Sequence, residues 1–370
     1  MKKVLLLILL LVLAAGGAGA WGWYCITKPY QGFPSEGVFV TVPHGASSRG
    51  VARMLEGSGV VRSAIAFEIY ARRHPRRSLE AGEYFFDHAE SGRDVFWKLA
   101  KGDVYQIPFT VREGETLYDI AHDLETGHFL SADDFVKAAN DPMLVRDIDP
   151  HALTLEGFLF PATYQMPRHP IAVELTAAMV KKFKDEWARV SPPMAGDDKT
   201  RLASGYPISS IVTLASLVER ETPKKDERPL VAGVFENRLR KEMMLQCDPT
   251  VIYVLQQEGR YNGTLNGADL HVHSPYNTYE HTGLPPGPIG NPGEASLRAA
   301  LHPAATDYLY FVANTEGGHF FSATLAEHNR NVTKYRRLLA GLPATPPPPP
   351  PQAEAYGKKK AHAKPHKGTA

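Results

Sequence analysis

The 370-residue chain is long enough for two or three domains, and its 43% apolar and 22% charged residues are typical of a folded globular protein. Its formal net charge of +1 gives no support to nucleic-acid binding as the main task, so no nucleic-acid partner is expected. Cys25 and Cys247, its two cysteines, cannot form a disulfide framework.

The N-terminal segment, residues 1–28, is predicted to be a membrane anchor. Residues 4–27 contain no charged side chain and are bounded by lysines on both sides. As a helix this stretch would span roughly 35 Å, enough to cross a bilayer. Ala18-Gly-Ala20 resembles a signal-peptide cleavage site, but Trp21 and Trp23 continue the apolar run and favour a retained anchor. With its positive N-terminus in the cytoplasm, we expect a single-pass protein of the inner (plasma) membrane whose catalytic domain lies on the periplasmic or extracytoplasmic side.

An internal repeat follows the anchor. The pattern of residues 41–61 recurs 69 positions later, in residues 110–130, without a gap. Each copy has a short strand, a glycine turn, a hydroxyl residue near a helix start and apolar positions at helical spacing, which predicts two small α/β modules over residues 35–104 and 105–152. Residues 109–121 resemble the start of a LysM domain, a small glycan-binding fold. This resemblance implies that the LysM-like modules bind glycan, and the alternative is a spacer that holds the catalytic domain off the membrane.

The rest of the chain divides into a folded domain and a tail. Residues 153–342 are predicted to form an α+β catalytic domain, which makes the whole chain an α+β protein. Within it, residues 170–190 have the periodicity of a long amphipathic helix. Six consecutive prolines and a lysine-rich end predict a disordered, proline-rich basic tail over residues 343–370. This tail either keeps the protein soluble or attaches to an anionic wall or membrane surface.

The most informative helix begins near Ser209-Ser210, where a serine is the expected N-cap, and ends at Thr222, because Pro223 disfavours helical geometry there. Its apolar positions form one stripe, which consists of Ile211, Leu214, Leu217 and Val218. Continued by one turn, the stripe reaches Glu221, whereas Glu219 lies about 200° away around the axis.

Glu221 is therefore the candidate general acid. Burial on an apolar face and the negative end of the helix dipole both favour its protonated form, which a general acid requires. The alternative is an exposed glutamate at a helix end, paired with Arg220 or Lys224.

Several separate segments, in order, resemble the endolytic murein transglycosylase family, the YceG-like proteins. They are residues 155–161, 215–222, 234–239, 246–253, 276–279 and 283–289, and 302–304 with 308–312. The resemblance spans nearly everything before the proline tail and implies that Glu221 is the catalytic residue. It also implies cleavage of the MurNAc–GlcNAc bond within peptidoglycan glycan strands, leaving a 1,6-anhydro end. The family's association with cell-wall synthesis machinery suggests further protein partners.

The implied mechanism needs one carboxyl group. Glu221 would protonate the leaving glycosidic oxygen and then deprotonate the C6 hydroxyl of the same muramic sugar, which attacks C1. A muramidase with Glu219, Glu156 or Asp248 as a second carboxylate is one rival. A non-catalytic wall-binding scaffold is the other.

The neighbouring motifs are candidates for substrate binding. Gln246 could hydrogen-bond a sugar, and Asp248-Pro249 is an N-cap and N1 signature, for which capping is favoured over substrate contact. Tyr276, Asn277 and Tyr279 could stack on sugars and bind N-acetyl groups, or could belong to a loop that satisfies its own backbone. Residues 283–289 have the stiffness of a cleft wall. Cys247 stands where a threonine or similar residue is usual in the family.

Metal catalysis is not expected, and no cofactor is predicted. The histidines match no helical His-x-x-x-His pair with a glutamate base, and the cysteines add no thiolate cluster. The histidines considered are His271, His273, His281, His302, His319 and His328.

Overall fold

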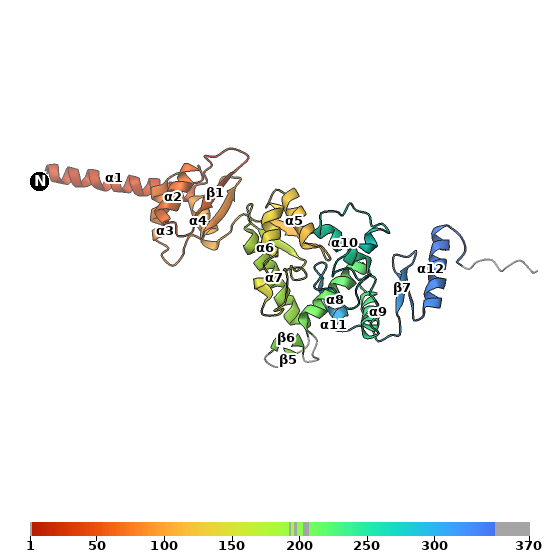
Figure 1. The fold of residues 1–370 in the computed structure, drawn as a ribbon. Helices are drawn as coiled ribbons and strands as arrows, with labels where there is room; N and C mark the ends of the chain where they lie inside the picture. The colour runs from red at the N-terminus through yellow and green to blue at the C-terminus, as the bar shows by residue number, and fades with distance from the viewer. Residues whose placement is uncertain (1, 192–193, 196–197, 203–206, 345–370) are drawn as a thin grey trace, which may run out of the picture.

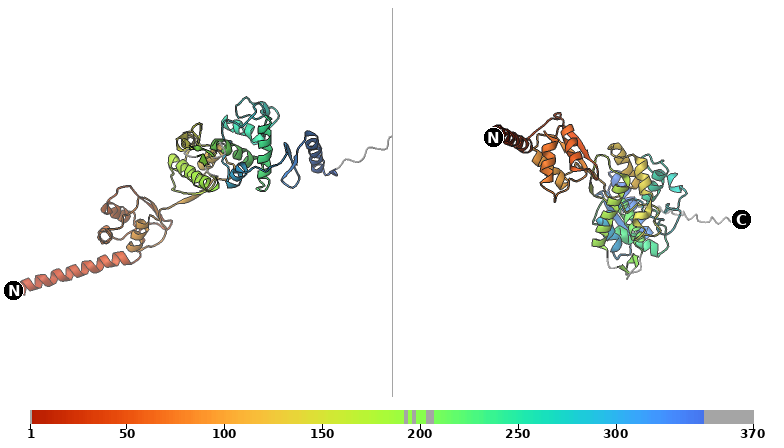
Figure 2. Two further views of the ribbon diagram at one scale, coloured as in Figure 1. Left: turned by 90° about the horizontal axis from the view of Figure 1, so that it is seen from below. Right: turned by 90° about the vertical axis from the view of Figure 1, so that its left-hand side faces the viewer.

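The structure, a computed structural model, describes residues 2–191, 194–195, 198–202 and 207–344. In these residues the strands form two-stranded antiparallel sheets and the rest of the regular structure is helical, as expected for an α+β protein. The parts follow one another in a row from the N-terminal helix through a small module to a larger body (Figures 1 and 2).

Helix α1 (Lys2–Thr27) projects from the first module as a single long helix (Figure 2). It is long and apolar enough to cross a membrane, with a mean hydropathy of 2.5. Only its end is covered by protein, because Cys25 and Ile26 are buried in the core of the first module.

The first module has the order strand, helix, helix, strand. Val51, Leu55 and Phe67 on its two helices pack against Tyr84 and Phe86 of its second strand, and this core is separate from that of the larger body. Ser47 and Ser63 cap the two helices with their hydroxyl groups. The elements are β1 (Val38–Val42), α2 (Ser48–Gly57), α3 (Ala64–Arg72), β2 (Gly82–Phe86) and the additional α4 (Gly92–Lys101).

The second module repeats this order. Its first helix begins and ends 69 residues after that of the first module, as the repeat in the sequence predicts. Its last strand pairs with its first, Phe109 opposite Tyr164, so the module extends to Met166. The sequence-based boundary after residue 152 is corrected by this pairing, since an insertion separates the second helix from the closing strand. The elements are β3 (Ile107–Thr110), α5 (Leu117–Thr126), α6 (Ala132–Ala139), the 3-10 turn η1 (Pro142–Val145) and β4 (Thr163–Met166).

The second module and the helices that follow it share one hydrophobic core. Buried side chains from Phe109 to Ala300 form a single cluster, so these residues are one folded body rather than two domains. The long helix predicted over residues 170–190 is confirmed as α7. The elements are α7 (Ala172–Val190), β5 (Met194–Ala195), β6 (Asp198–Leu202), α8 (Ile208–Glu221), α9 (Arg228–Arg240), α10 (Asp248–Gln257), the 3-10 turn η2 (Asp269–His271) and α11 (Glu294–Leu301).

Helix α8 runs through the middle of this body (Figure 1). Every residue from Ile211 to Glu219 is buried, so the helix is covered all round rather than along one stripe. It begins at Ile208 after Pro207, without a side-chain cap, so the prediction of a serine N-cap is wrong. It ends at Glu221, with Thr222 in extended geometry before Pro223, as predicted.

A hairpin and a helix complete the described chain. Asn237 of α9 fixes the segment before the hairpin by donating to the carbonyls of Thr306 and Tyr308, at 2.7 and 2.9 Å. The elements are β7 (Tyr310–Ala313), β8 (His319–Ser322) and α12 (Leu325–Leu339). The tail predicted to be disordered lies outside the described residues from residue 345 on.

Candidate active site

The last residue of α8, Glu221, is the centre of the site. Its carboxylate oxygen Oε2 lies 3.4 Å from the Sγ of Cys247, which precedes α10. Burial and the neighbouring Glu221 raise the pKa of the Cys247 thiol well above its usual value, so the sulfur keeps its proton and donates it. Glu221 is thus held by a donor from another element while remaining half-buried.

Opposing influences set the protonation of Glu221. Burial raises the pKa of its carboxyl group above the ordinary value, and the nearby Asp248 carboxylate acts in the same direction. The hydrogen bond from Cys247 and the electrostatic interactions with His319 and Arg238 lower the pKa, with a smaller combined effect. The net shift is upward, so the carboxyl group keeps its proton to a higher pH than an ordinary glutamate does, as a general acid requires.

Two loops that the sequence separates by some thirty residues are joined beside this carboxyl group. The backbone N–H of Gln246 donates to the carbonyl of Thr278 at 3.1 Å, and that of Cys247 donates to the Thr278 hydroxyl at 2.9 Å. Gln246 has a φ of 51°, an uncommon conformation for a residue with a side chain, and its side chain is exposed. The predicted substrate-binding segments around Gln246 and Tyr279 are therefore neighbours.

Asp248 is not the cap of α10. The N-cap position belongs to Cys247, and Asp248 and Pro249 occupy the first turn, so the prediction that Asp248 caps the helix is corrected by one residue. Its exposed carboxylate accepts a short hydrogen bond from the Tyr279 hydroxyl. Asp248 is therefore available to the site rather than used as a helix cap, and its hydrogen bond fixes Tyr279 at the edge of the site.

The remaining predicted residues have internal partners. Asn277 is fully buried, and its amide donates to the carbonyls of Leu270 and Val272 while its oxygen accepts from the N–H of Tyr279. Its side chain thus holds the loop together, which is the second of the two interpretations of this motif. Tyr276 is half-buried with its ring 5.2 Å from that of Tyr253.

The model of the YceG-like family matches residues 40–334. The chain belongs to the YceG-like family. It is 35% identical over 317 residues to the endolytic murein transglycosylase of Bacillus subtilis, an alignment that covers 80% of this chain and 84% of that protein. It is 30% identical to the endolytic murein transglycosylase of Streptococcus pneumoniae serotype 2, again over 80% of this chain, but spans only 58% of that longer protein.

The fold agrees with a solved structure from the same family. The crystal structure of a putative YceG-like protein from Listeria monocytogenes matches with a TM-score of 0.50 and 33% sequence identity, over 80% of this chain and 99% of that one. The similarity thus extends over the modules and the larger body of this YceG-like chain.

Glu219, the other glutamate of the YceG-like motif, is held inside the protein. Its carboxylate lies 2.5 Å from the guanidinium of Arg228 and accepts the N–H of Gly293 at 3.0 Å. Arg228 also lies 3.3 Å from Glu113 in the second module. These contacts connect α8, α9, the start of α11 and the second module, so Glu219 positions the helix that carries Glu221.

Glu156 is also occupied internally. Its buried carboxyl group accepts from the N–H of Leu117, at 3.0 Å, and from the Asn291 amide, at 2.9 Å. Burial raises its pKa to about 8. Of the three carboxylates considered as partners for Glu221, Asp248 lies close enough for its charge to raise the pKa of Glu221.

The turn of the second module holds the end of α8. Arg220, next to Glu221, donates to the carbonyl of Gly114 at 2.9 Å. Asn291 pairs with both sides of the turn, accepting from Gly114 N–H at 2.8 Å and donating to the Glu115 carbonyl at 2.9 Å. Gly114 has a φ of 83°, which favours glycine at this point. This turn is the start of the LysM-like sequence pattern, so in this YceG-like protein it supports the site.

The sequence did not indicate that Arg238 and His319 belong to the site. Arg238 belongs to the segment 234–239, which resembles the family, but nothing in the sequence indicated a role for it. Its guanidinium donates to the carbonyls of Leu309, at 2.7 Å, and Leu245, at 2.9 Å. His319 was considered only for zinc, and its Nδ1 lies 2.8 Å from Glu227. Electrostatic interactions with both residues lower the pKa of Glu221. No group of three or more potential metal ligands occurs among the residues that the structure describes.

Proposed function

We propose that this protein is an endolytic murein transglycosylase, a lyase that cleaves the MurNAc–GlcNAc bond within peptidoglycan glycan strands with Glu221 as its one acid–base group. Its relatives from Bacillus and Streptococcus carry that name. The observation that carries the assignment is the contrast on one helix end, where Glu219 is paired with Arg228 and Glu221 accepts a hydrogen bond from the Cys247 thiol.

The proposed reaction uses Glu221 twice. The protonated carboxyl group gives its proton to the glycosidic oxygen as the C1–O bond breaks, and the resulting carboxylate accepts the proton of the C6 hydroxyl. The C6 oxygen forms the new bond to C1, so the products are a free GlcNAc hydroxyl and a 1,6-anhydro-MurNAc end. The substrate supplies the nucleophile, so no second enzymic carboxylate is required.

Other side chains would bind and orient the strand. Gln246 is exposed and precedes Cys247, which contacts the Glu221 carboxyl group, and the hydroxyl of Tyr279 is fixed by Asp248. Arg238 and His319 would stabilise the Glu221 carboxylate that forms after the first proton transfer. Tyr276 and Asn277 would shape the loop that presents Tyr279.

The catalytic body would stand on the outer face of the membrane, anchored by α1. The burial of Cys25 and Ile26 in the first module supports a retained helix, because cleavage of the chain after Ala20 would leave this contact on a seven-residue stub. The two strand–helix–helix–strand modules would act as LysM-like glycan readers or as supports. The hydrogen bond between the turn of the second module and Arg220 favours a supporting role for that module.

Product analysis tests this function against its rivals. We expect the full chain to shorten purified glycan strands to long fragments before disaccharides appear, and mass spectrometry to find 1,6-anhydro ends. Reducing MurNAc ends would instead show a muramidase in which Asp248 activates water, and intact strands would leave only a wall-binding scaffold.

The thiol of Cys247 should tune the pH dependence of cleavage. The hydrogen bond from Cys247 lowers the pKa of Glu221, so Cys247→Ala should raise that pKa. Because the general acid must be protonated, activity is lost as the pH rises through this pKa, and the alkaline limb of kcat/KM should move to higher pH in the variant. Cys247→Thr restores a hydroxyl donor and should return the limb to the wild-type position or below it. An unchanged limb in Cys247→Ala would contradict the role of the thiol.

A further inference from the structure

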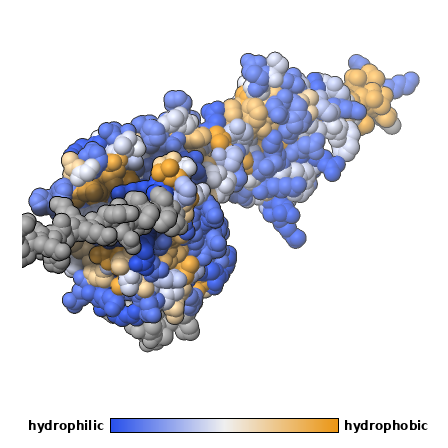
Figure 3. Space-filling view, turned by 90° about the vertical axis from the view of Figure 1, so that its right-hand side faces the viewer, coloured by the Kyte–Doolittle hydropathy of each residue, from blue (hydrophilic) through white to orange (hydrophobic). Residues whose placement is uncertain are grey.

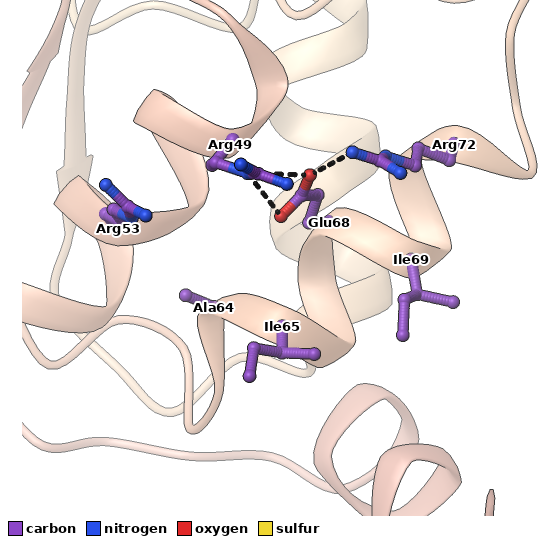
Figure 4. A pocket seen from close by; sticks show the side chains of 7 residues that line it. All are labelled: Arg49, Arg53, Ala64, Ile65, Glu68, Ile69 and Arg72. Atoms are coloured by element: carbon purple, nitrogen blue, oxygen red, sulfur yellow. Dashed lines mark hydrogen bonds and ion pairs between the residues drawn. The ribbon is translucent and has the colours of Figure 1, made fainter.

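A basic pocket lies on the outer face of the first module, far from Glu221. It has a volume of about 360 Å³ and is formed by α2 and α3. Figure 4 shows Glu68 between Arg49 and Arg72, with Arg53 farther along α2 and with Ile65 and Ile69 below. The pocket thus combines guanidinium groups with two exposed isoleucine side chains.

This face of the first module is predominantly positive. Residues 48–77 contain seven arginines and two glutamates, in a chain whose formal net charge is +1. Glu68 lies 3.2 Å from Arg49 and 2.5 Å from Arg72, so one carboxylate faces two guanidinium groups. The other glutamate, Glu56, accepts from the N–H of Ala64 at 3.0 Å. Within the described ranges, Arg53 makes no ion pair, and the pocket keeps an excess of positive charge.

The pocket adjoins a second cavity that lies along α1. This second cavity of about 360 Å³ lies between α1 and α3 and is lined by Ala18, Gly22 and Trp23 on the first helix and by Ile69 and Arg73 on the second. Ile69 belongs to both cavities. The basic face therefore begins where α3 packs against the end of α1.

The length of α1 sets the height of this face above the membrane. A hydrocarbon core needs about 20 helical residues, so a span that begins near Val4 reaches its outer edge near Trp23. Helix α3 packs beside Ala18 to Trp23, so with this span it would lie at the outer boundary of the membrane. Ile65 and Ile69 are 72% and 50% exposed to solvent, as expected of side chains that lipid covers. Figure 3 shows the apolar side chains of α1 gathered at the far end of the molecule.

We propose that this α2–α3 face binds the phosphate headgroups of anionic phospholipids. Arg49, Arg53 and Arg72 contact the phosphate oxygens, and Ile65 and Ile69 enter the boundary of the acyl chains. This inference rests on α1 as the membrane anchor in the proposed function. Lipid bound on this face fixes the direction in which the first module leaves the membrane.

The test uses the full chain in nanodiscs of phosphatidylcholine, alone or mixed with phosphatidylglycerol. An environment-sensitive dye is attached at Ile65→Cys or, as the matched control, at Met143→Cys, which is 68% exposed in the second module. The native Cys25 and Cys247 are buried and should not react. We expect severalfold stronger quenching by brominated lipid at position 65 than at 143, and a further increase with phosphatidylglycerol.

Charge variants distinguish a specific contact with the headgroups from a general effect of the protein's net charge. The triple variant Arg49→Gln, Arg53→Gln, Arg72→Gln should lose the increase that phosphatidylglycerol gives. The control is a triple variant that removes the same charge from α12, at the opposite end of the molecule: Arg330→Gln, Lys334→Gln, Arg336→Gln (Figure 1). This control should keep the increase in quenching that phosphatidylglycerol gives. A protein that alkaline carbonate releases from membranes would overturn the anchor itself. A protein that stays membrane-bound with position 65 unquenched in both lipid mixtures would overturn only the lipid-binding face.

Discussion

Glu221→Gln is expected to lower glycan cleavage by about 10²- to 10⁴-fold, the range that a general acid–base group contributes. Glutamine keeps the size of the side chain and can still accept the Cys247 proton, but it can neither donate a proton to the glycosidic oxygen nor accept one from the C6 hydroxyl. Since the proposed reaction assigns both transfers to this residue, both should fail together. The loss should appear in kcat, measured as anhydro ends released per enzyme from purified strands.

Two controls accompany this measurement. Glu258→Gln makes the same chemical change at an exposed position at the end of α10 and should keep full activity. Asp248→Asn removes the other carboxylate near Glu221 and should lower activity less than Glu221→Gln, since no step of the lyase reaction requires it. A Glu221→Gln protein that cleaves at the wild-type rate would remove Glu221 from the chemistry. Equal losses in the Asp248 and Glu221 variants would favour a two-carboxylate hydrolase.

The sequence was sufficient for the elements whose signals are local. The uncharged run predicted α1, the repeat predicted the 69-residue offset between α2 and α5, and Pro223 set the end of α8. Helical phase also separated Glu219 from Glu221, and the structure gives the two side chains different partners. Each of these depends on a few neighbouring residues and on backbone geometry.

The rest depended on contacts between distant residues. Nothing near Asn291 in the sequence indicates that it holds the turn at Gly114, and this contact merges the second module with the catalytic body. The extent of the second module was missed because its closing strand follows an insertion absent from the first copy. The assignment of Asp248 as a cap failed by one residue, because Cys247 takes the extended geometry of that position. Arg238 and His319 reach the site from α9 and β8, which only the tertiary fold brings together.

Glu219→Ala is expected to destabilise the catalytic body by about 3–5 kcal/mol, because it leaves the buried Arg228 without its nearest carboxylate. Both side chains of this pair are 3% exposed, and the N–H of Gly293 would lose its acceptor as well. Since about 1.4 kcal/mol corresponds to tenfold, amides in α8 that exchange by opening of this body should exchange with solvent about 100-fold faster or more. Hydrogen exchange followed by mass spectrometry measures this, and residues 38–104, which have a separate core, should be unchanged.

A surface pair gives the matched comparison for Glu219. Lys181 and Asp185 on α7 are 3.1 Å apart with exposed side chains, so Asp185→Ala should change stability by less than ~1 kcal/mol. Replacing both Glu219 and Arg228 with methionine should recover much of the loss, because no charge of this pair then remains buried. Glu219→Ala with wild-type exchange in α8 would show that the ion pair does not hold this helix. Exchange at the wild-type rate in Glu221→Gln would show that the two neighbouring glutamates divide their roles, with Glu219 fixing the helix end on which Glu221 acts.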